Sequence, residues 1–235
     1  VRGEGLTLST SALGVGGQRV AIGGDVGDVN ALVLDSGTLS GVTRLQVRGY
    51  DGIDLVGGVK VGAMDLSGQP LMNEVVLDSR LVRGVATSAD AQTALVQARH
   101  VTLRNTSGLA ADLNATGDTS LTVMSTPAVA DATAEGVTIG PGAQRLAFNK
   151  AELASTGDVV LRGQGSLSAQ GDLLLNAARL TAAAKAKSSI DSDKTLSVLA
   201  IDDGNKADGD GCSATCKIED GFKCTTPGQP CTRTT

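Results

Sequence analysis

The sequence predicts an all-β protein in which residues 1–200 form a parallel β-helix and residues 201–235 form a small disulfide-rich module. Three observations indicate this division. Short alternating apolar segments recur through the first two hundred residues, the 235-residue chain has no Trp, one Tyr and two Phe, and all four cysteines lie after residue 200. Small aliphatic side chains can fill a narrow, uniform core without aromatic rings, so a coil that stacks repeatedly on itself suits this composition.

The apolar segments of residues 1–200 each predict a strand of three to five residues with one buried face. Gly, Asn, Asp and Ser lie between them, where turns are needed. The predicted strands contain Leu6–Leu8, Val20–Ile22, Leu32–Leu34, Leu45–Val47, Val59–Val61, Val75–Leu77, Val101–Leu103, Leu121–Val123, Val137–Ile139, Leu146–Phe148, Val159–Leu161, Leu173–Leu175 and Leu196–Val198.

The glycines indicate a period. Gly117, Gly136 and Gly157 each open a strand, and they are about twenty residues apart. This interval holds two or three strands with their turns, which is the length of one β-helical coil. Roughly nine or ten coils would then fit into residues 1–200. Inward positions would form ladders of Val, Leu and Ile, with Thr, Ser, Arg and Asp pointing outward.

Residues 157–180 read GDVVLRGQGSLSAQGDLLLNAARL. This run resembles the degenerate repeats of the filamentous haemagglutinin-like family, large bacterial surface proteins exported by two-partner secretion. The similarity is clearest over residues 155–200. It implies a right-handed parallel β-helix and an exposed, elongated adhesin or stalk.

Two other folds fit parts of the pattern. Ala177–Lys187 is rich in Ala, Leu, Lys and Arg, which are strong helix formers, so a short helix is an alternative there. An antiparallel β-sandwich would also show many short strands. The sandwich would be expected to contain more aromatic residues and tight two-residue hairpin turns.

The C-terminal module contains Cys212, Cys216, Cys224 and Cys231 in a segment too short to bury much apolar surface. An even number of closely spaced cysteines predicts disulfides, and the three pairings that four cysteines allow remain open. Disulfides in turn predict a location outside the reducing cytoplasm.

Residues 201–224 carry glycines, acids and cysteines in the order DDGNxxxGDGCSxxCxxExGFxC after Ile201. This order resembles the Myxococcus cysteine-rich repeat, a short module of secreted and surface proteins that is similar in style to Lin-12/Notch repeats. Ile201 stands where that family usually has a cysteine. The resemblance implies an extracellular location and no activity.

Acidic residues crowd the start of the module. Asp203, Asn205, Asp208 and Asp210 are the best candidates for metal ligands, because oxygen ligands in a flexible glycine-rich loop suit calcium. The spacing resembles the D-x-[DN]-x-[DN]-G calcium loop without matching it. A solvated, turn-rich loop held by disulfides is the alternative interpretation.

Several function classes are not expected. The net charge is −5 and there is no basic stripe, which argues against nucleic-acid binding. No run of eighteen apolar residues occurs, so no membrane span is predicted. His100 is the one histidine of the chain, and we interpret it as a polar residue on a coil face rather than as the base of a nucleophilic site.

Sugar cleavage needs a pair of carboxylates, and Asp35, Asp54 and Glu74 lie about one coil apart, so they could stack in one outward column. Acids solvated on turns are the favoured interpretation. The triplets that begin at Asn105 and Asn114 match the N-glycosylation sequence.

The sequence therefore predicts a non-enzymatic protein of the cell exterior or bacterial cell surface, an adhesive stalk with a disulfide-stapled end. Its expected partners are cell-surface or matrix components, or copies of itself. Two alternatives remain: a fibre subunit that adds head to tail, and a β-helical polysaccharide lyase or hydrolase.

Overall fold

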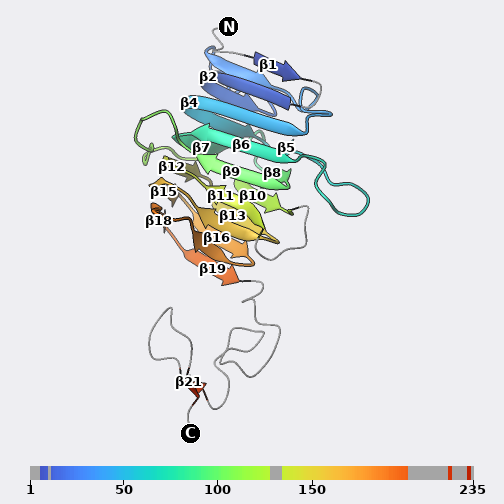
Figure 1. Ribbon diagram of the computed structural model, residues 1–235. Helices are drawn as coiled ribbons and strands as arrows, with labels where there is room; N and C mark the ends of the chain where they lie inside the picture. Colours follow the sequence, from blue (N-terminus) through green and yellow to red (C-terminus); the bar gives the residue numbers. More distant parts are fainter. Residues whose placement is uncertain (1–5, 10–11, 128–133, 201–221, 224–231, 234–235) are drawn as a thin grey trace.

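The computed structural model describes residues 6–9, 12–127, 134–200, 222–223 and 232–233. Strands, turns and loops make up these ranges, which contain no helix, so the all-β prediction is confirmed (Figure 1). The alternative helix over Ala177–Lys187 is wrong. That stretch holds the end of β16 (Asp172–Ala177), all of β17 (Leu180–Ala182) and the first residue of β18 (Lys187–Ser192).

All thirteen apolar segments predicted as strands lie in or directly beside observed strands. Besides β16, β17 and β18, the strands are β1 (Leu6–Ser9), β2 (Ala12–Ile22), β3 (Ala31–Leu34), β4 (Arg44–Val56), β5 (Lys60–Val61), β6 (Glu74–Ser79), β7 (Leu81–Val85), β8 (Thr93–Ala98), β9 (His100–Arg104), β10 (Ser120–Ser125), β11 (Glu135–Ile139), β12 (Gly142–Ala147), β13 (Lys150–Ser155), β14 (Asp158–Leu161), β15 (Gln164–Ala169), β19 (Leu196–Ala200), β20 (Phe222–Lys223) and β21 (Thr232–Arg233).

The strands pair in parallel along three faces. The first face stacks β6, β9, β11, β14 and β17, the second stacks β7, β12, β15 and β18, and the third stacks β5, β8, β10, β13, β16 and β19. The first two faces belong to one sheet because the long strand β4 bends through both: its first half pairs with β6 and its second half with β7. This parallel stacking rules out the antiparallel sandwich.

The core is a set of aliphatic columns inside the three faces. One column runs through Leu45, Val75, Val101, Val137 and Val159 in strand register, and every member is buried. A column on the third face joins Val61, Val96, Val123, Leu153 and Leu175 in the same way. Each fully buried Val or Leu side chain contributes about 1.5–3 kcal/mol through the hydrophobic effect. Aliphatic side chains repeated at one register position can therefore replace the missing aromatic residues.

The length of one turn varies along the chain. The register advances by 36 residues from Val101 to Val137, but by 22 from Val137 to Val159 and by 21 from Val159 to Leu180. The expected period of about twenty residues thus matches the C-terminal turns. The longest turn contains residues 105–119, which form a loop without any strand.

The two ends of the stack differ. At the N-terminal end, β1 pairs antiparallel with the first half of β2, and β3 pairs with its second half. At the other end, β17, β18 and β19 are the last strands of their faces.

Candidate functional site

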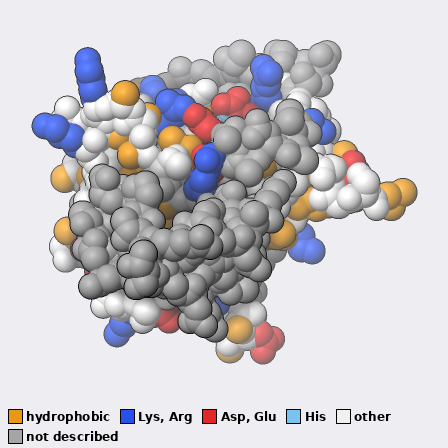
Figure 2. Space-filling model, turned by 60° about the horizontal axis from the view of Figure 1, so that its bottom comes forward, with side chains coloured by type: hydrophobic (Ala, Val, Ile, Leu, Met, Phe, Trp, Pro, Cys, Tyr) orange, Lys and Arg blue, Asp and Glu red, His pale blue; other side chains and the backbone are white. Residues whose placement is uncertain are grey.

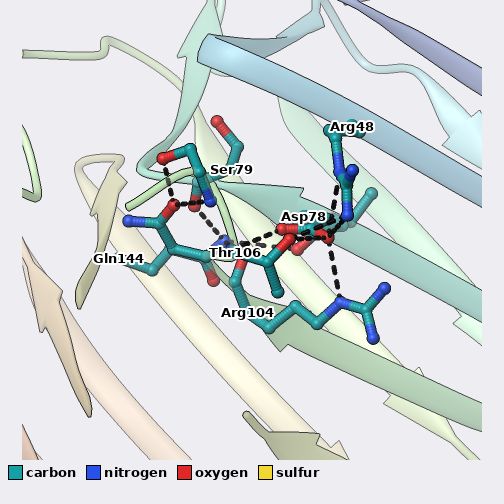
Figure 3. Close-up of polar contacts among 9 residues, drawn as sticks. Arg48, Asp78, Ser79, Arg104, Thr106 and Gln144 are labelled. Carbon is teal, nitrogen blue, oxygen red and sulfur yellow. Dashed lines mark hydrogen bonds and ion pairs between the residues drawn. The ribbon is translucent and has the colours of Figure 1, made fainter. Parts of the chain in front are cut away.

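The outward side chains of the first face form a charged ladder, which we define as Arg48, Asp78 and Arg104 (Figure 3). They come from β4, β6 and β9, and each directly follows an inward residue of a core column: Val47, Leu77 and Leu103 respectively. Because side chains alternate across a strand and these strands are in register, charges at equivalent positions lie side by side. The alternating signs make each neighbour an ion-pair partner.

Asp78 is the centre of the ladder. Its Oδ2 accepts hydrogen bonds from Arg104 Nε at 3.0 Å, from Arg48 Nη2 at 3.2 Å and from the Thr106 hydroxyl at 2.8 Å. Its Oδ1 accepts from the backbone N–H of Thr106 at 2.8 Å. The carboxylate is only 1% exposed, whereas both arginines remain partly exposed. Arg48 also donates to the Thr106 hydroxyl, so the loop after β9 is fixed to the same group.

Burial by itself raises the pKa of Asp78, but the donors from Thr106, Arg104 and Arg48 outweigh it and hold the pKa below the ordinary value. The same contact raises the pKa of Arg48. Asp78 therefore stays ionised at neutral pH and carries no proton to give. Its chemistry here is that of an anchor between strands and a loop.

Gln144 of β12 is buried and lies beside Ser79, close to the charged ladder (Figure 3). Its side-chain NH₂ donates to the carbonyl oxygens of Ser79 at 2.8 Å, Arg104 at 3.0 Å and Leu77 at 3.3 Å. Ser79 and Leu77 belong to β6, and Arg104 ends β9 just before the loop of residues 105–119. A buried polar side chain is costly unless it is hydrogen-bonded, and these carbonyls satisfy the donors of Gln144.

Carboxylates held by arginine recur elsewhere on the outer faces. Asp54 is fully buried and accepts from Arg19 Nη1 at 3.0 Å and from Arg83 Nε at 2.8 Å. Asp158 and Arg179 form a bidentate pair with both distances at 3.0 Å. In Figure 2, acidic side chains lie beside basic ones in one cluster near the top of the view. Hydrogen bonds between an arginine and a carboxylate are among the stronger ones in proteins because both partners are charged.

His100 begins β9 and is half-buried. Its Nδ1 lies 3.2 Å from the Glu135 carbonyl oxygen, and its Nε2 lies 3.2 Å from the Thr138 hydroxyl. Burial lowers the pKa of His100, with an opposing contribution from Glu74. The position agrees with the interpretation of His100 as a polar residue on a coil face.

Asp35, Asp54 and Glu74 do not form the column that the enzyme alternative would need, and Asp54, fully buried in β4, is not the solvated turn residue that we expected. Asp35 lies in the turn after β3 and accepts from the backbone N–H of Thr38 at 2.9 Å. Asp54 is in register with Arg83, whereas Glu74 is in register with His100 on the other face. Extra loop residues between the turns shift the three acids to different positions.

The predicted calcium ligands Asp203, Asn205, Asp208 and Asp210 lie outside the described residues. So do the four cysteines, Cys212, Cys216, Cys224 and Cys231. Among the described residues, no three His, Cys, Asp or Glu side chains form a group that could hold a metal ion. The described part of the chain also has no helix with the length and hydropathy to cross a lipid bilayer.

Sequence reasoning missed the charged ladder, although a signal for it was present. Each member is the residue that follows a predicted apolar segment, and the signs read plus, minus, plus. Reading that signal requires the register, which depends on loop lengths.

Comparison with known proteins gave no significant match to a family model, a curated protein or a solved structure. The description of the fold and of the charged ladder therefore comes from this chain alone.

Proposed function

We propose that the protein is an extracellular structural and adhesive β-solenoid, in which a right-handed parallel β-helix serves as a surface stalk or adhesin segment. The observation that carries this proposal is the continuous aliphatic core, closed on its outer faces by carboxylates that arginines hold in register. Such a body resists bending and separation of its turns. Its partners would be cell-surface or matrix components that contact the mixed-charge faces.

The charged groups support a structural role because their bonding capacity is used within the protein. Asp78 and Asp54 each accept from two arginines, and Asp158 accepts from one through two bonds. A general acid for glycoside cleavage needs a raised pKa, whereas the pKa of Asp78 is lowered. The lyase or hydrolase alternative has also lost the column of Asp35, Asp54 and Glu74 on which it depended.

The fibre alternative is favoured by one feature and opposed by another. The open edges of β17, β18 and β19 could accept strands of another copy. Head-to-tail growth would need a matching parallel edge at the other end, where β1 runs antiparallel on β2. We therefore rank the stalk above the self-assembling fibre.

Electron microscopy of the purified, oxidised chain combined with a binding assay tests the proposal. Negative staining should show single short rods, and the labelled protein should bind whole cells or an extracellular matrix preparation in a saturable way. Long filaments would favour the fibre subunit instead. Rods that bind no such surface at any concentration would leave the adhesive role without support.

We also propose that Cys212, Cys216, Cys224 and Cys231 are oxidised and that Asp203, Asn205, Asp208 and Asp210 bind calcium. Any ligand that binds the folded form stabilises it, so a chelator should lower the melting temperature of the module by several degrees. If the chelator leaves the melting curve unchanged, and the Asp203→Asn/Asp208→Asn variant melts like the original protein, calcium is removed from the proposal.

A further inference from the structure

The C-terminal end of the stack exposes both apolar side chains and strand edges. Leu180 and Leu196 are 43% and 41% exposed and Val198 is 52% exposed, although they continue columns whose previous members are at most 1% exposed. Within the described part of the chain, no strand pairs with the far edges of β17, β18 and β19. A free edge beside apolar side chains attracts another strand unless something covers it.

Basic side chains surround this end. Lys185 and Lys187 lie in and after the turn between β17 and β18, and Lys194 lies just before β19; all three are exposed. The ion pairs of the described residues involve none of these lysines. Two acids lie at the same end: Asp193 is bound to Arg145 through two hydrogen bonds, and Asp191 of β18 is exposed. The three lysines and Arg145 outnumber these two acids, so the end carries an excess of positive charge beside its apolar side chains.

The chain continues from this end with the opposite charge. Residues 201–220 contain six acidic residues and two lysines, and they also contain Ile201 and Ile218. They follow β19 without a linker, which gives them a high effective concentration at the end of the stack. A second copy is a weaker candidate, because its N-terminal edge is occupied by β1 and β3.

We propose that residues 201–221 bind across the C-terminal end of their own stack, with their carboxylates against Lys185, Lys187 and Lys194 and their isoleucines over Leu196 and Val198. The segment then closes the strand edges and prevents growth of the stack at this end. The proposal holds whether or not the protein is a stalk, since it concerns contacts within one chain.

Zero-length carbodiimide cross-linking of the full oxidised chain, read by mass spectrometry, tests the contact. Glu219 and Asp220 are the informative acids because about nineteen residues separate them from the end of β19. A tether of that length could span roughly 60 Å when extended, so their position in the sequence does not by itself place them near the three lysines. Cross-links from these acids should go to Lys185, Lys187 or Lys194, at least five times more often than to the exposed lysines Lys60 and Lys150. Equal yields for all five lysines would overturn the proposal.

An equal mixture of ¹⁵N-labelled and unlabelled chain separates the two occupants. Cross-links within one chain carry one isotope, and this result is expected. Cross-links that join labelled to unlabelled peptides in half of the products would assign the end to a second copy and overturn the proposal.

Amide hydrogen exchange gives an independent readout in the full chain. In the Lys185→Gln/Lys187→Gln/Lys194→Gln variant, the β19 amides that do not bond to β16 should exchange about tenfold faster than in the original protein. The matched Lys60→Gln/Lys150→Gln variant should leave them unchanged. Equal exchange in all three proteins, with β13 protected in each as evidence of folding, would contradict the proposed contact.

Discussion

Asp78 and Arg104 face each other across the β6–β9 pair, and Arg104 Nε donates to Asp78 Oδ2 at 3.0 Å. Arg48 reaches the same oxygen from the opposite side. Three consecutive turns of the stack, which begin with β4, β6 and β9, are thus joined through one buried carboxylate. The loop that replaces a strand in the third of these turns is attached to it through Thr106.

Replacing Asp78 by Asn should lower the free energy of unfolding by about 2 kcal/mol, because hydrogen bonds to a charged acceptor contribute about 1.5–3 kcal/mol and an amide brings donors toward the arginines. Urea denaturation checks this value. The matched Asp90→Asn variant, in an exposed loop, should change stability by less than about 0.5 kcal/mol. Equal effects of the two substitutions would mean that the ladder contributes nothing.

Acid should weaken the protein partly through Asp78. Its folded-state pKa is lowered, so the unfolded chain binds the proton more readily. The stabilisation is complete above the unfolded value of about 3.9 and is lost as the pH falls through the lower folded value. Urea midpoints measured from pH 6 to pH 3 should fall less steeply for Asp78→Asn than for the original protein.

His100 should titrate below its ordinary pKa of about 6.5, because burial disfavours the charged imidazole. As the chain has one histidine, a single imidazole resonance in the NMR spectrum reports this titration. The unfolded chain takes up a proton at a higher pH than the folded one, so stability falls as the pH drops through this range. A titration midpoint above 6.5 would show that the ring is more solvated, or nearer an acid, than described.

Gly84 of β7 packs against the Phe148 ring, and a Cβ placed on Gly84 would lie 2.7 Å from two of its ring carbons and would also collide with the Thr119 hydroxyl. Gly84→Ala should therefore destabilise the protein by about 1–3 kcal/mol, the usual cost of overpacking. Gly16→Ala on β2 is the control, because nothing lies within 4 Å of the added methyl group. Thermal melting of both variants checks the contrast.

The sequence predicts this fold well because both depend on the same alternation. Apolar triplets such as Val75–Leu77 identify the inward positions directly, and the shortage of aromatic residues indicates a narrow core. Partners across turns could not be predicted, since one turn takes 36 residues and the next 22. Asp54 and Glu74 lie on different faces because the turn that contains them takes 30 residues, from Leu45 to Val75, and not the expected twenty.

Gln144, close to the charged ladder, shows why part of this region was also beyond prediction. It occupies an inward register position, opposite Leu167, where the pattern predicts an aliphatic residue. A polar side chain at this position donates to three backbone carbonyls that belong to residues 40 to 67 positions earlier in the chain. No local signal in the sequence records these partners.

The two N-glycosylation triplets should behave differently when the chain is secreted by cells that carry this machinery. Asn105 is buried, and its side-chain NH₂ donates to the carbonyls of Leu109 at 2.8 Å and Ala143 at 2.6 Å. Attaching a glycan to that nitrogen would replace one of its two hydrogens, so at least one of these bonds would be lost, and the sugar would have to fit at a buried position. Asn114 is exposed in the same loop. Intact mass spectrometry should therefore show at most one glycan, which Asn114→Gln removes, whereas a glycan at Asn105 in folded protein would contradict the described loop.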